Sequence, residues 1–298
     1  MSWNYPDRQQ DPQMQRRPGP RIPIRLIIAG IIMLVSIISY YSKTEVNPVT
    51  GEKQRVAMGA EQEMVLGLQA APKMAQEMGG AINPQNDPRA ARVAQIGRRL
   101  VGETDAARSP YALRNNFHFY LLNDPDTINA FALPGGQIFI TRALYDRLEN
   151  EAQLAGVIGH EIGHVIHRHG AEHMASGQLG QAMVTAVGMG VGGDANSGQI
   201  AAQATAMAAQ FFQLKYGRHD ELESDAYGLR LMTEVGLDPA EMLGVMRILA
   251  QASKGPRQPE MMQTHPYPEK RIEQIQQILE TYKDEWSTKQ LSKGERLR

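Results

Sequence analysis

The sequence contains no cysteine among its 298 residues. Disulfide bonds, thiolate metal ligands and a cysteine nucleophile are therefore excluded, although the compartment stays open because a domain of this size does not need disulfides. An excess of either charge is also lacking, with 31 Lys+Arg against 32 Asp+Glu. This balance predicts no nucleic acid as a partner. The length suffices for one large domain or two small ones.

Long apolar runs are scarce, and the one that stands out lies near the N-terminus. Residues 26–41 carry no charge and are rich in isoleucine. As a helix this run spans about 24 Å, and about 30 Å if counted from residue 22, which predicts a transmembrane anchor over 22–41. A cleaved signal peptide is the competing interpretation, but no small-x-small cleavage site follows the run.

The segment before the anchor, residues 1–21, is polar and holds four prolines and four arginines. Such a segment cannot bury enough apolar surface to fold alone, so we expect a disordered tail. Because basic residues precede the anchor, the tail should stay in the cytoplasm. The rest of the chain is then expected on the periplasmic side of the inner membrane, attached by one span.

The remaining chain divides by its patterns into a linker over 42–58, a domain over 59–285 and a flexible tail over 286–298. Apolar and aromatic runs near the middle predict two to four short strands in a small sheet. Helical spacing dominates elsewhere, which makes the fold class α+β and helix-rich. The expected strands are 117–122, 131–133 and 137–140, and the expected helices include 59–78, 88–101, 149–169, two within 176–212, 221–233, one beginning after Asp238-Pro239, and 269–282, with a loop over 254–268.

The pattern that carries chemistry is His160-Glu161-Ile162-Gly163-His164. Residues four apart lie on one face of a helix, so His160 and His164 can both place an imidazole on one ion. Glu161 sits beside the first histidine and can take a proton from a water molecule that attacks a peptide carbonyl. Leu154, Ile158 and two further apolar residues form the opposite stripe, which predicts a helix buried on one side.

Other histidines follow this pattern closely. The segment 169–173 matches an inverted zinc motif, but Gly170 weakens its helix. We interpret His169, Glu172 and His173 as a solvated helix end, with a structural hydrogen bond of His169 as the further option. His167 shares the face of His164 and is interpreted as a packing residue. Gly170 also stands where a longer zinc motif would place a third histidine. The third ligand must therefore come from elsewhere in the chain.

A glutamate on a second helix, with a carboxylate one turn later to brace a histidine, is a common solution. Glu221 and Asp225 have this spacing. Glu234/Asp238 and Glu280/Asp284 have it too, but Gly236 interrupts the former and the latter lies on an exposed C-terminal helix. Glu223, within the same acidic run as Glu221, is interpreted as part of a solvated face.

These residues resemble the membrane-associated gluzincins, a zinc metallopeptidase family that includes the CAAX prenyl protease, the heat-shock protease X and bacterial periplasmic quality-control peptidases. The resemblance runs from residue 47 to about residue 277. The features that carry it are Pro48-Val49-Thr50-Gly51, the run from Asn129 to Gly136, the histidine helix followed by Arg168-His169, Glu221 through Asp225, and His265-Pro266-Tyr267-Pro268 ahead of Arg271-Ile272.

The resemblance implies a zincin-type domain with Zn²⁺ bound by His160, His164 and Glu221. It makes Glu161 the catalytic base, and Asp225 would orient a ligand histidine. His265 would enter the cleft, where it either stabilises the developing oxyanion or occupies the open position of the metal in a latent form.

The resemblance also implies how a polypeptide substrate binds. The strand 137–140 would be the sheet edge that pairs with an extended substrate. The relatives with many membrane spans do not fit, because this sequence shows one good span, and the single-anchor periplasmic type fits better.

The predicted function is a zinc-dependent metalloendopeptidase that hydrolyses internal bonds of misfolded or unassembled envelope proteins. The alternative is a non-catalytic zinc-binding chaperone or adaptor for unfolded envelope proteins. Glu161 argues against this alternative, because metal binding alone does not need it.

Overall fold

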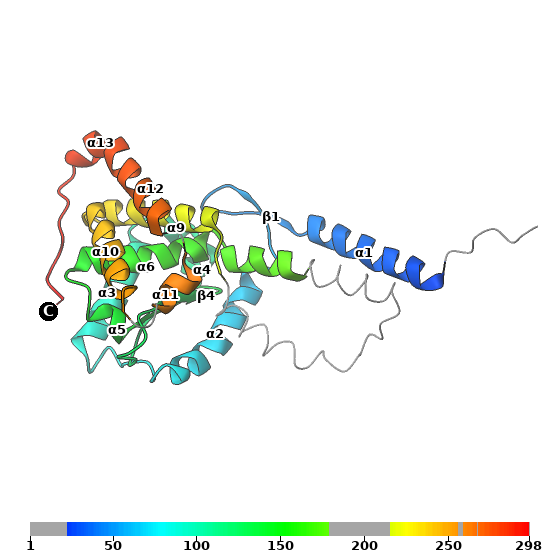
Figure 1. Ribbon diagram of the computed structural model, residues 1–298, viewed down its shortest axis with the longest axis horizontal. Helices are drawn as coiled ribbons and strands as arrows, with labels where there is room; N and C mark the ends of the chain where they lie inside the picture. The colour runs from blue at the N-terminus through cyan, green and yellow to red at the C-terminus, as the bar shows by residue number, and fades with distance from the viewer. Residues whose placement is uncertain (1–22, 179–214, 256–258, 267, 298) are drawn as a thin grey trace, which may run out of the picture.

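The computed structural model describes residues 23–178, 215–255, 259–266 and 268–297. In Figure 1 the helix α1 projects away from the other elements. The expected tail over 1–21 and nearly all of the expected helices within 176–212 lie outside the described residues. The elements are α1 Ile24–Ser42, β1 Thr44–Val46, β2 Lys53–Arg55, α2 Ala60–Glu77, α3 Pro88–Gly102, η1 Asp105–Arg108, α4 Pro110–Leu113, β3 His118–Leu122, β4 Ala130–Leu133, β5 Gln137–Thr141, α5 Arg142–Tyr145, α6 Glu151–Ile166, α9 Arg218–Glu234, η2 Pro239–Glu241, α10 Met242–Ala252, α11 Glu260–Thr264, α12 Pro268–Thr281 and α13 Lys283–Ser287.

The larger sheet has three strands in the order β3-β5-β4. Because β5 pairs in parallel with β3 and antiparallel with β4, it is the middle strand. The prediction that strand 137–140 is a substrate-pairing edge is therefore wrong, since both rows of its backbone groups are already paired. The outer side of β3 is bridged at Leu122 by Ala81. Among the described residues, no strand pairs with the other edge of β4, where Ala130 is buried and Ala132 is partly exposed.

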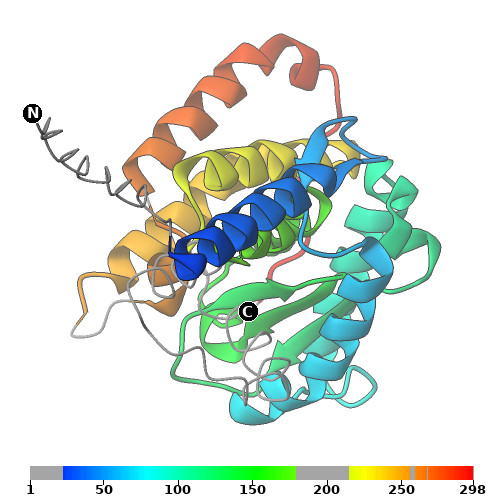
Figure 2. The ribbon, with the colours of Figure 1, turned by 90° about the vertical axis from the view of Figure 1, so that its right-hand side faces the viewer.

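The two faces of this sheet pack against different helices, as Figure 2 shows. Phe139 and Phe131 point to the side of α2, where they stack at 4.8 Å between ring centroids. Ile138 and Ile140 alternate with them and join the main core with α3 and α6. Each fully buried side chain of this size contributes about 1.5–3 kcal/mol. The sheet therefore holds α6 firmly from one side.

The helix α9 covers the other side of α6. A Cβ at Gly163 would lie 2.8 Å from Ser224 Cα, and one at Gly159 would lie 3.2 Å from Gly228 Cα. Glycine at these positions lets the two helices approach closely. All residues of α6 are consequently buried. The prediction of a helix buried on one side alone is wrong, because α9 packs on the histidine face.

The C-terminal end of α6 is capped by the segment predicted as a linker. Asn47 donates from Nδ2 to Ile166 O at 2.6 Å, and Gln54 donates from Nε2 to His167 O. Both residues belong to the β1–β2 hairpin region, and both are buried. The last carbonyls of a helix need such partners. The segment predicted as a linker over 42–58 thus contains a hairpin, β1 paired with β2, that docks on the domain.

The N-terminal end of α6 is capped by the last residues of the chain. The N–H groups of Glu151 and Ala152 donate to Glu295 O and Lys293 O, both at 3.0 Å. The described part of the predicted flexible tail over 286–298 therefore packs on the domain. Its backbone satisfies donors that the first turn of a helix leaves free.

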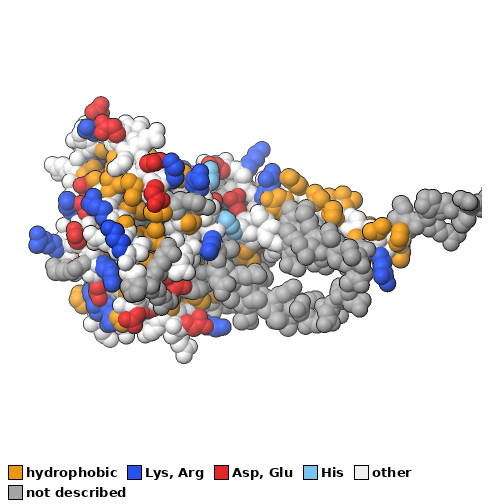
Figure 3. Space-filling model, in the orientation of Figure 1, with side chains coloured by type: hydrophobic (Ala, Val, Ile, Leu, Met, Phe, Trp, Pro, Cys, Tyr) orange, Lys and Arg blue, Asp and Glu red, His pale blue; other side chains and the backbone are white. Residues whose placement is uncertain are grey.

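The helix α1 is the one described helix that is long and apolar enough to cross a membrane. Its large side chains, such as Ile31 and Leu34, are exposed, and Figure 3 shows them as an apolar surface along the projecting helix. An apolar surface of this extent is unfavourable in water and marks a membrane or protein contact. The structure therefore supplies a candidate N-terminal membrane helix.

The region predicted as a loop over 254–268 contains the short helix α11. His265 is the residue that ends this helix, and its backbone N–H donates to Met261 O at 2.8 Å. Met261 is buried in the main core. The packing of α11 therefore places His265 inside the domain.

Candidate metal centre

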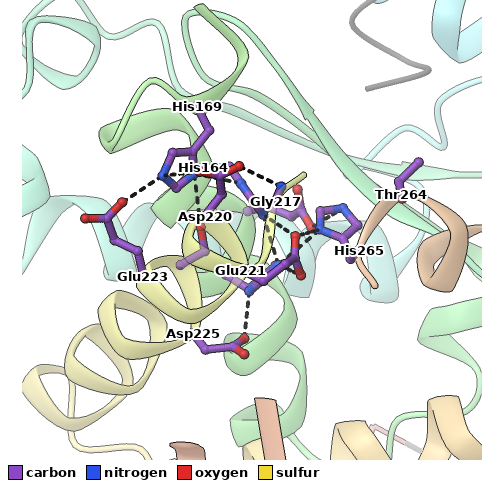
Figure 4. Close-up of polar contacts among 12 residues, drawn as sticks. His164, His169, Gly217, Asp220, Glu221, Glu223, Asp225, Thr264 and His265 are labelled. Atoms are coloured by element: carbon purple, nitrogen blue, oxygen red, sulfur yellow. Dashed lines mark hydrogen bonds and ion pairs between the residues drawn. The ribbon is translucent and has the colours of Figure 1, made fainter. Parts of the chain in front are cut away.

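Four side chains from three separate segments meet where α9 covers α6. His160 and His164 come from α6, Glu221 from the first turn of α9, and His265 from the end of α11. All four are buried, and their ligand atoms lie within 4.8 Å of one another. His160 Nε2 lies 3.1 Å from His164 Nε2, and Glu221 Oε1 lies 3.5 Å from His164 Nε2. Figure 4 shows Glu221 and His265 pointing toward each other.

Asp225 lies one turn after Glu221 on α9 and faces His160. Its Oδ1 is 2.8 Å from His160 Nδ1. This contact leaves Nε2 of His160 turned toward the cluster, as in metal sites where a carboxylate orients a histidine. The structure thus brings Asp225 to the place that the sequence analysis expected.

Arg271 of α12 is a buried residue of the site that the sequence analysis did not assign. Its Nε and Nη2 bind the two carboxylate oxygens of Asp225 at 2.7 Å, and its Nη1 lies 2.9 Å from Glu221 Oε2. One planar guanidinium therefore aligns both carboxylates. The available signal was its spacing, because Arg271 precedes the core residue Ile275 by four positions on the same helix face.

Glu161 lies beside this cluster with both carboxylate oxygens buried. Neither oxygen has a hydrogen-bond partner among the described residues, and the same is true of His265 Nε2. Buried polar atoms without partners are rare and indicate a bound ion or water. The donor set of imidazole nitrogens and a carboxylate fits a transition-metal ion such as zinc. The residues present therefore fit a metal.

The electrostatics favour the metal-binding protonation states of His164 and Glu221, whereas burial lowers the pKa of His265 but the charges of Glu221 and Glu161 outweigh it and raise that pKa. Burial holds the pKa of His164 well below its usual range. Burial also raises the pKa of Glu221, but the charges of His265 and Arg271 outweigh this effect and hold that pKa well below its ordinary value. A neutral imidazole thus faces an ionised carboxylate, as ligands must.

His169 and Glu223 lie differently from their predicted positions. His169 is 1% exposed, with Nδ1 at 2.9 Å from His164 Nδ1 and Nε2 at 2.9 Å from Glu223 Oε2. The interpretation of 169–173 as a solvated helix end is wrong for His169, which is buried, but the structural hydrogen bond considered for His169 is present. The interpretation of Glu223 as part of a solvated face is also wrong. The reason is Arg168, whose φ of 54° turns the chain after α6 and folds His169 back beside His164.

Tyr216 is a further residue that the sequence analysis missed. Its ring stacks on His164 at 3.9 Å between centroids, with the planes 25° apart. Its backbone N–H donates to Thr264 O at 3.1 Å, next to His265. No periodic pattern marks an aromatic residue in the segment before α9, so the sequence offered no signal for it.

Comparison with known proteins identifies the family. The sequence matches the family described as Peptidase family M48 over residues 87–279. This stretch is more than half of the chain and includes all four residues of the cluster. The chain belongs to peptidase family M48. The resemblance to the membrane-associated gluzincins is thereby confirmed, with the helix-rich fold class and the metallopeptidase character that it implied.

Several curated proteins share the M48 region. The Beta-barrel assembly-enhancing protease of Escherichia coli (strain K12) is 33% identical over 193 residues, which are 63% of this chain and 38% of that protein. The protein of the same name from Yersinia pestis is 35% identical over 188 residues, 59% of this chain and 36% of that protein. The Mitochondrial metalloendopeptidase OMA1 of Schizosaccharomyces pombe is 26% identical over 266 residues, 88% of this chain and 74% of that protein. The chain thus spans less than two fifths of the length of these two bacterial relatives.

Membership of M48 implies a metal cofactor and polypeptide substrates for this chain. The cluster of His160, His164, Glu221 and His265 is its candidate metal site. The roles of the individual residues are taken up as proposals below.

Proposed function

We propose that this protein is a zinc-dependent endopeptidase whose metal is held by His160, His164 and Glu221. The observation that carries this proposal is the meeting of these donors with the carboxylate of Glu161 in one buried cluster. When bound, zinc supplies Lewis acidity, which polarises a peptide carbonyl and makes a water molecule more acidic. Asp225 keeps Nε2 of His160 directed at the ion.

Glu161 is the general base in this proposal. Its carboxylate accepts the proton of the attacking water and passes it to the nitrogen of the leaving peptide. The position of Glu161 next to His160 on α6, together with its buried oxygens, supports this role. A non-catalytic zinc-binding chaperone or adaptor would have no use for a buried acid that lacks a hydrogen-bond partner in the described part of the chain and pairs with His265 Nε2 only at 3.7 Å.

His265 restrains the enzyme in this proposal. Its Nδ1 lies 3.2 Å from His160 Nε2 and 3.0 Å from Glu221 Oε1, which is the position of a fourth ligand. A ligand there occupies the place that a peptide carbonyl must enter. The contacts therefore favour a latent arrangement over a role of His265 in stabilising the oxyanion.

This edge of β4 is the proposed place for an extended substrate. Thr141 donates its N–H to Asn129 O at 3.0 Å, which starts the alternation of hydrogen-bonded and non-hydrogen-bonded pairs between β5 and β4. By this alternation Ala130 and Ala132 direct their N–H and C=O groups away from β5. These free groups can pair with a substrate strand running beside α6.

The proposed setting is the cell envelope, with the domain on the periplasmic side of the inner membrane and α1 as its single anchor. The apolar, exposed helix α1 supports the anchor. Two relatives carry a name that joins protease activity with β-barrel assembly. We therefore propose misfolded or unassembled envelope proteins as substrates.

The first prediction tests the reaction by the digestion of unfolded casein. Wild-type protein loaded with one zinc should cleave casein at internal bonds, while Glu161→Gln should lose at least about a hundredfold in rate because the base is removed. Zinc content should stay equal in the two proteins, because Glu161 is not a ligand. Equal digestion by both would refute the proposed peptidase with Glu161 as its base, and no digestion by the zinc-loaded wild type would support the chaperone or adaptor.

A further inference from the structure

We propose that His167, His169 and Glu223 form a second site for a divalent transition-metal ion, and that filling it weakens the first centre. The site itself stands apart from the proposed peptidase function, whereas its effect on activity rests on that function. His167, His169 and Glu223 form a group separate from the four-residue cluster, and the M48 match does not assign a metal to them.

The three donor groups converge from two elements. His167 Nδ1 lies 3.2 Å from Glu223 Oε1, and His169 Nε2 lies 2.9 Å from Glu223 Oε2. One ligand atom from each residue lies within 4.8 Å of the others. In Figure 4, Glu223 and His265 lie on either side of His164. The second site therefore adjoins the first through His164.

His167 supplies the observation that points to a ligand. The residue is 7% exposed, yet its Nδ1 has no hydrogen-bond partner among the described residues. Glu223 Oε1 lies 3.2 Å from this Nδ1, but the two groups are not aligned for a hydrogen bond. An ordinary ion pair would align the N–H with the carboxylate, because a buried unpaired donor costs about 1–3 kcal/mol. A metal ion between the two groups accounts for both the proximity and the misalignment.

Further carboxylates and an access route surround these donors. Glu52 Oε2 lies 3.8 Å from His167 Nδ1 on a side chain that is 55% exposed and free to turn, so it can complete the ligand set. His167 and Glu223 also line a surface groove beside Tyr227 and Trp286. Two imidazoles with carboxylates select zinc, copper, nickel or cobalt over magnesium or calcium.

The two sites are coupled because His164 and His169 share one hydrogen. Their Nδ1 atoms are 2.9 Å apart, so one N–H fits between them. When His164 binds the first ion through Nε2, it donates from Nδ1 to His169, and His169 donates from Nε2 to Glu223. A second ion at His169 Nε2 displaces the hydrogen carried by that Nε2 atom, which leaves to solvent as a proton. Each ion is then bound to one imidazole of the hydrogen-bonded pair His164–His169, and the positive charges of the two ions repel each other.

The test is a zinc titration of the full-length protein after its metal has been removed by a chelator. Calorimetry and equilibrium dialysis should show two equivalents in the wild type, the second weaker than the first. His167→Gln should weaken the second equivalent at least about tenfold and leave the first intact. Glu223→Gln keeps an acceptor for His169 but should lose the second equivalent as well. His219→Gln, at a histidine that is 87% exposed and 3.9 Å from Glu223, is the matched control and should bind both.

Casein digestion reports the coupling in the same samples. Excess zinc should slow the wild type and His219→Gln, while His167→Gln should stay active. A single equivalent in the wild type, or two unchanged equivalents in His167→Gln, would overturn the second site. Glu221→Gln separates the two proposals, because it should lose the first equivalent and still bind at the second site whether or not the protein is a peptidase.

Discussion

At the residue scale, the two histidines of α6 are held by different partners. Nδ1 of His160 faces the carboxylate of Asp225 at 2.8 Å, whereas Nδ1 of His164 faces the imidazole of His169 at 2.9 Å. A carboxylate raises the basicity of a ligand imidazole more than a neutral ring does. We therefore expect His160 to be the stronger ligand and His164 to be the one through which other groups act on the metal.

The third ligand can be tested by a matched pair of substitutions. Glu221→Gln should lower bound zinc sharply, because an amide replaces a buried anionic donor. Glu280→Gln makes the same change at another glutamate that has an acidic residue four positions later. Because the side chain of Glu280 is 75% exposed on α12, this variant should keep its full zinc content. Metal analysis of both proteins gives the answer. Loss of zinc in Glu280→Gln with retention in Glu221→Gln would refute the choice of Glu221.

The two roles considered for His265 predict opposite results. If His265 occupies the fourth position, His265→Ala should cleave casein faster than the wild type, because the place for the carbonyl is opened. Zinc should remain bound through the other three ligands. A loss of about 10²–10³ in kcat would instead identify His265 as an oxyanion donor. The ratio of the two kcat values at equal zinc content decides between them.

At the scale of elements, the order of the strands decides where a substrate can bind. All five residues of β5 are buried, and an uninterrupted apolar run of this kind is typical of a middle strand. The run Ile138-Phe139-Ile140 therefore held a signal against an edge position. Substrate pairing moves to β4, which also packs on α6 beside the cluster.

The β4 edge is tested by removing one outward N–H. Ala132→Pro should lower kcat/KM for casein by about 2- to 10-fold, because one hydrogen bond of about 0.5–1.5 kcal/mol is lost. The β4–β5 pairing does not use this N–H, and proline is tolerated at such an edge. Ala132→Val adds similar bulk, keeps the N–H and should retain more activity. Equal kcat/KM in both variants, with equal melting temperatures, would place the substrate elsewhere.

At the scale of the whole molecule, both ends of α6 are capped by segments remote in sequence. The hairpin that follows α1 binds the carbonyls of Ile166 and His167, while the C-terminal segment binds the N–H groups of Glu151 and Ala152. Both segments therefore stabilise the helix that carries the candidate metal ligands. The hairpin follows α1 directly, so it also connects the candidate membrane helix to the domain.

The topology can be measured with a reporter fused after Arg298. A reporter that is active only outside the cytoplasm should be active in this fusion, because one span should carry the domain across the membrane. The matched control replaces the arginines of 1–21 with glutamate, which should reduce export by weakening the positive-inside signal. Activity of a cytoplasm-specific reporter at the same position would contradict the proposed orientation.

Local patterns determined much of this protein. The 3.6-residue period of a helix places His160 and His164 on one face wherever that helix packs. The same local logic predicted an apolar helix near the N-terminus and the helix start at Asp238, whose side chain accepts from Ala240 N. These features depend on residues within a few positions of one another, which is why a single sequence reveals them.

Only the tertiary structure decided which distant residues join them. Arg271 reaches Asp225, and His265 reaches Glu221, because α9 packs on α6, α12 packs on α9, and Met261 of α11 is buried in the main core. Strand order depends on which edge of β5 receives β3, and hydrophobic alternation does not specify that choice. The left-handed turn at Arg168 likewise brings His169 back to His164. Such contacts join residues separated by tens of positions, and their geometry follows from packing and not from local periodicity.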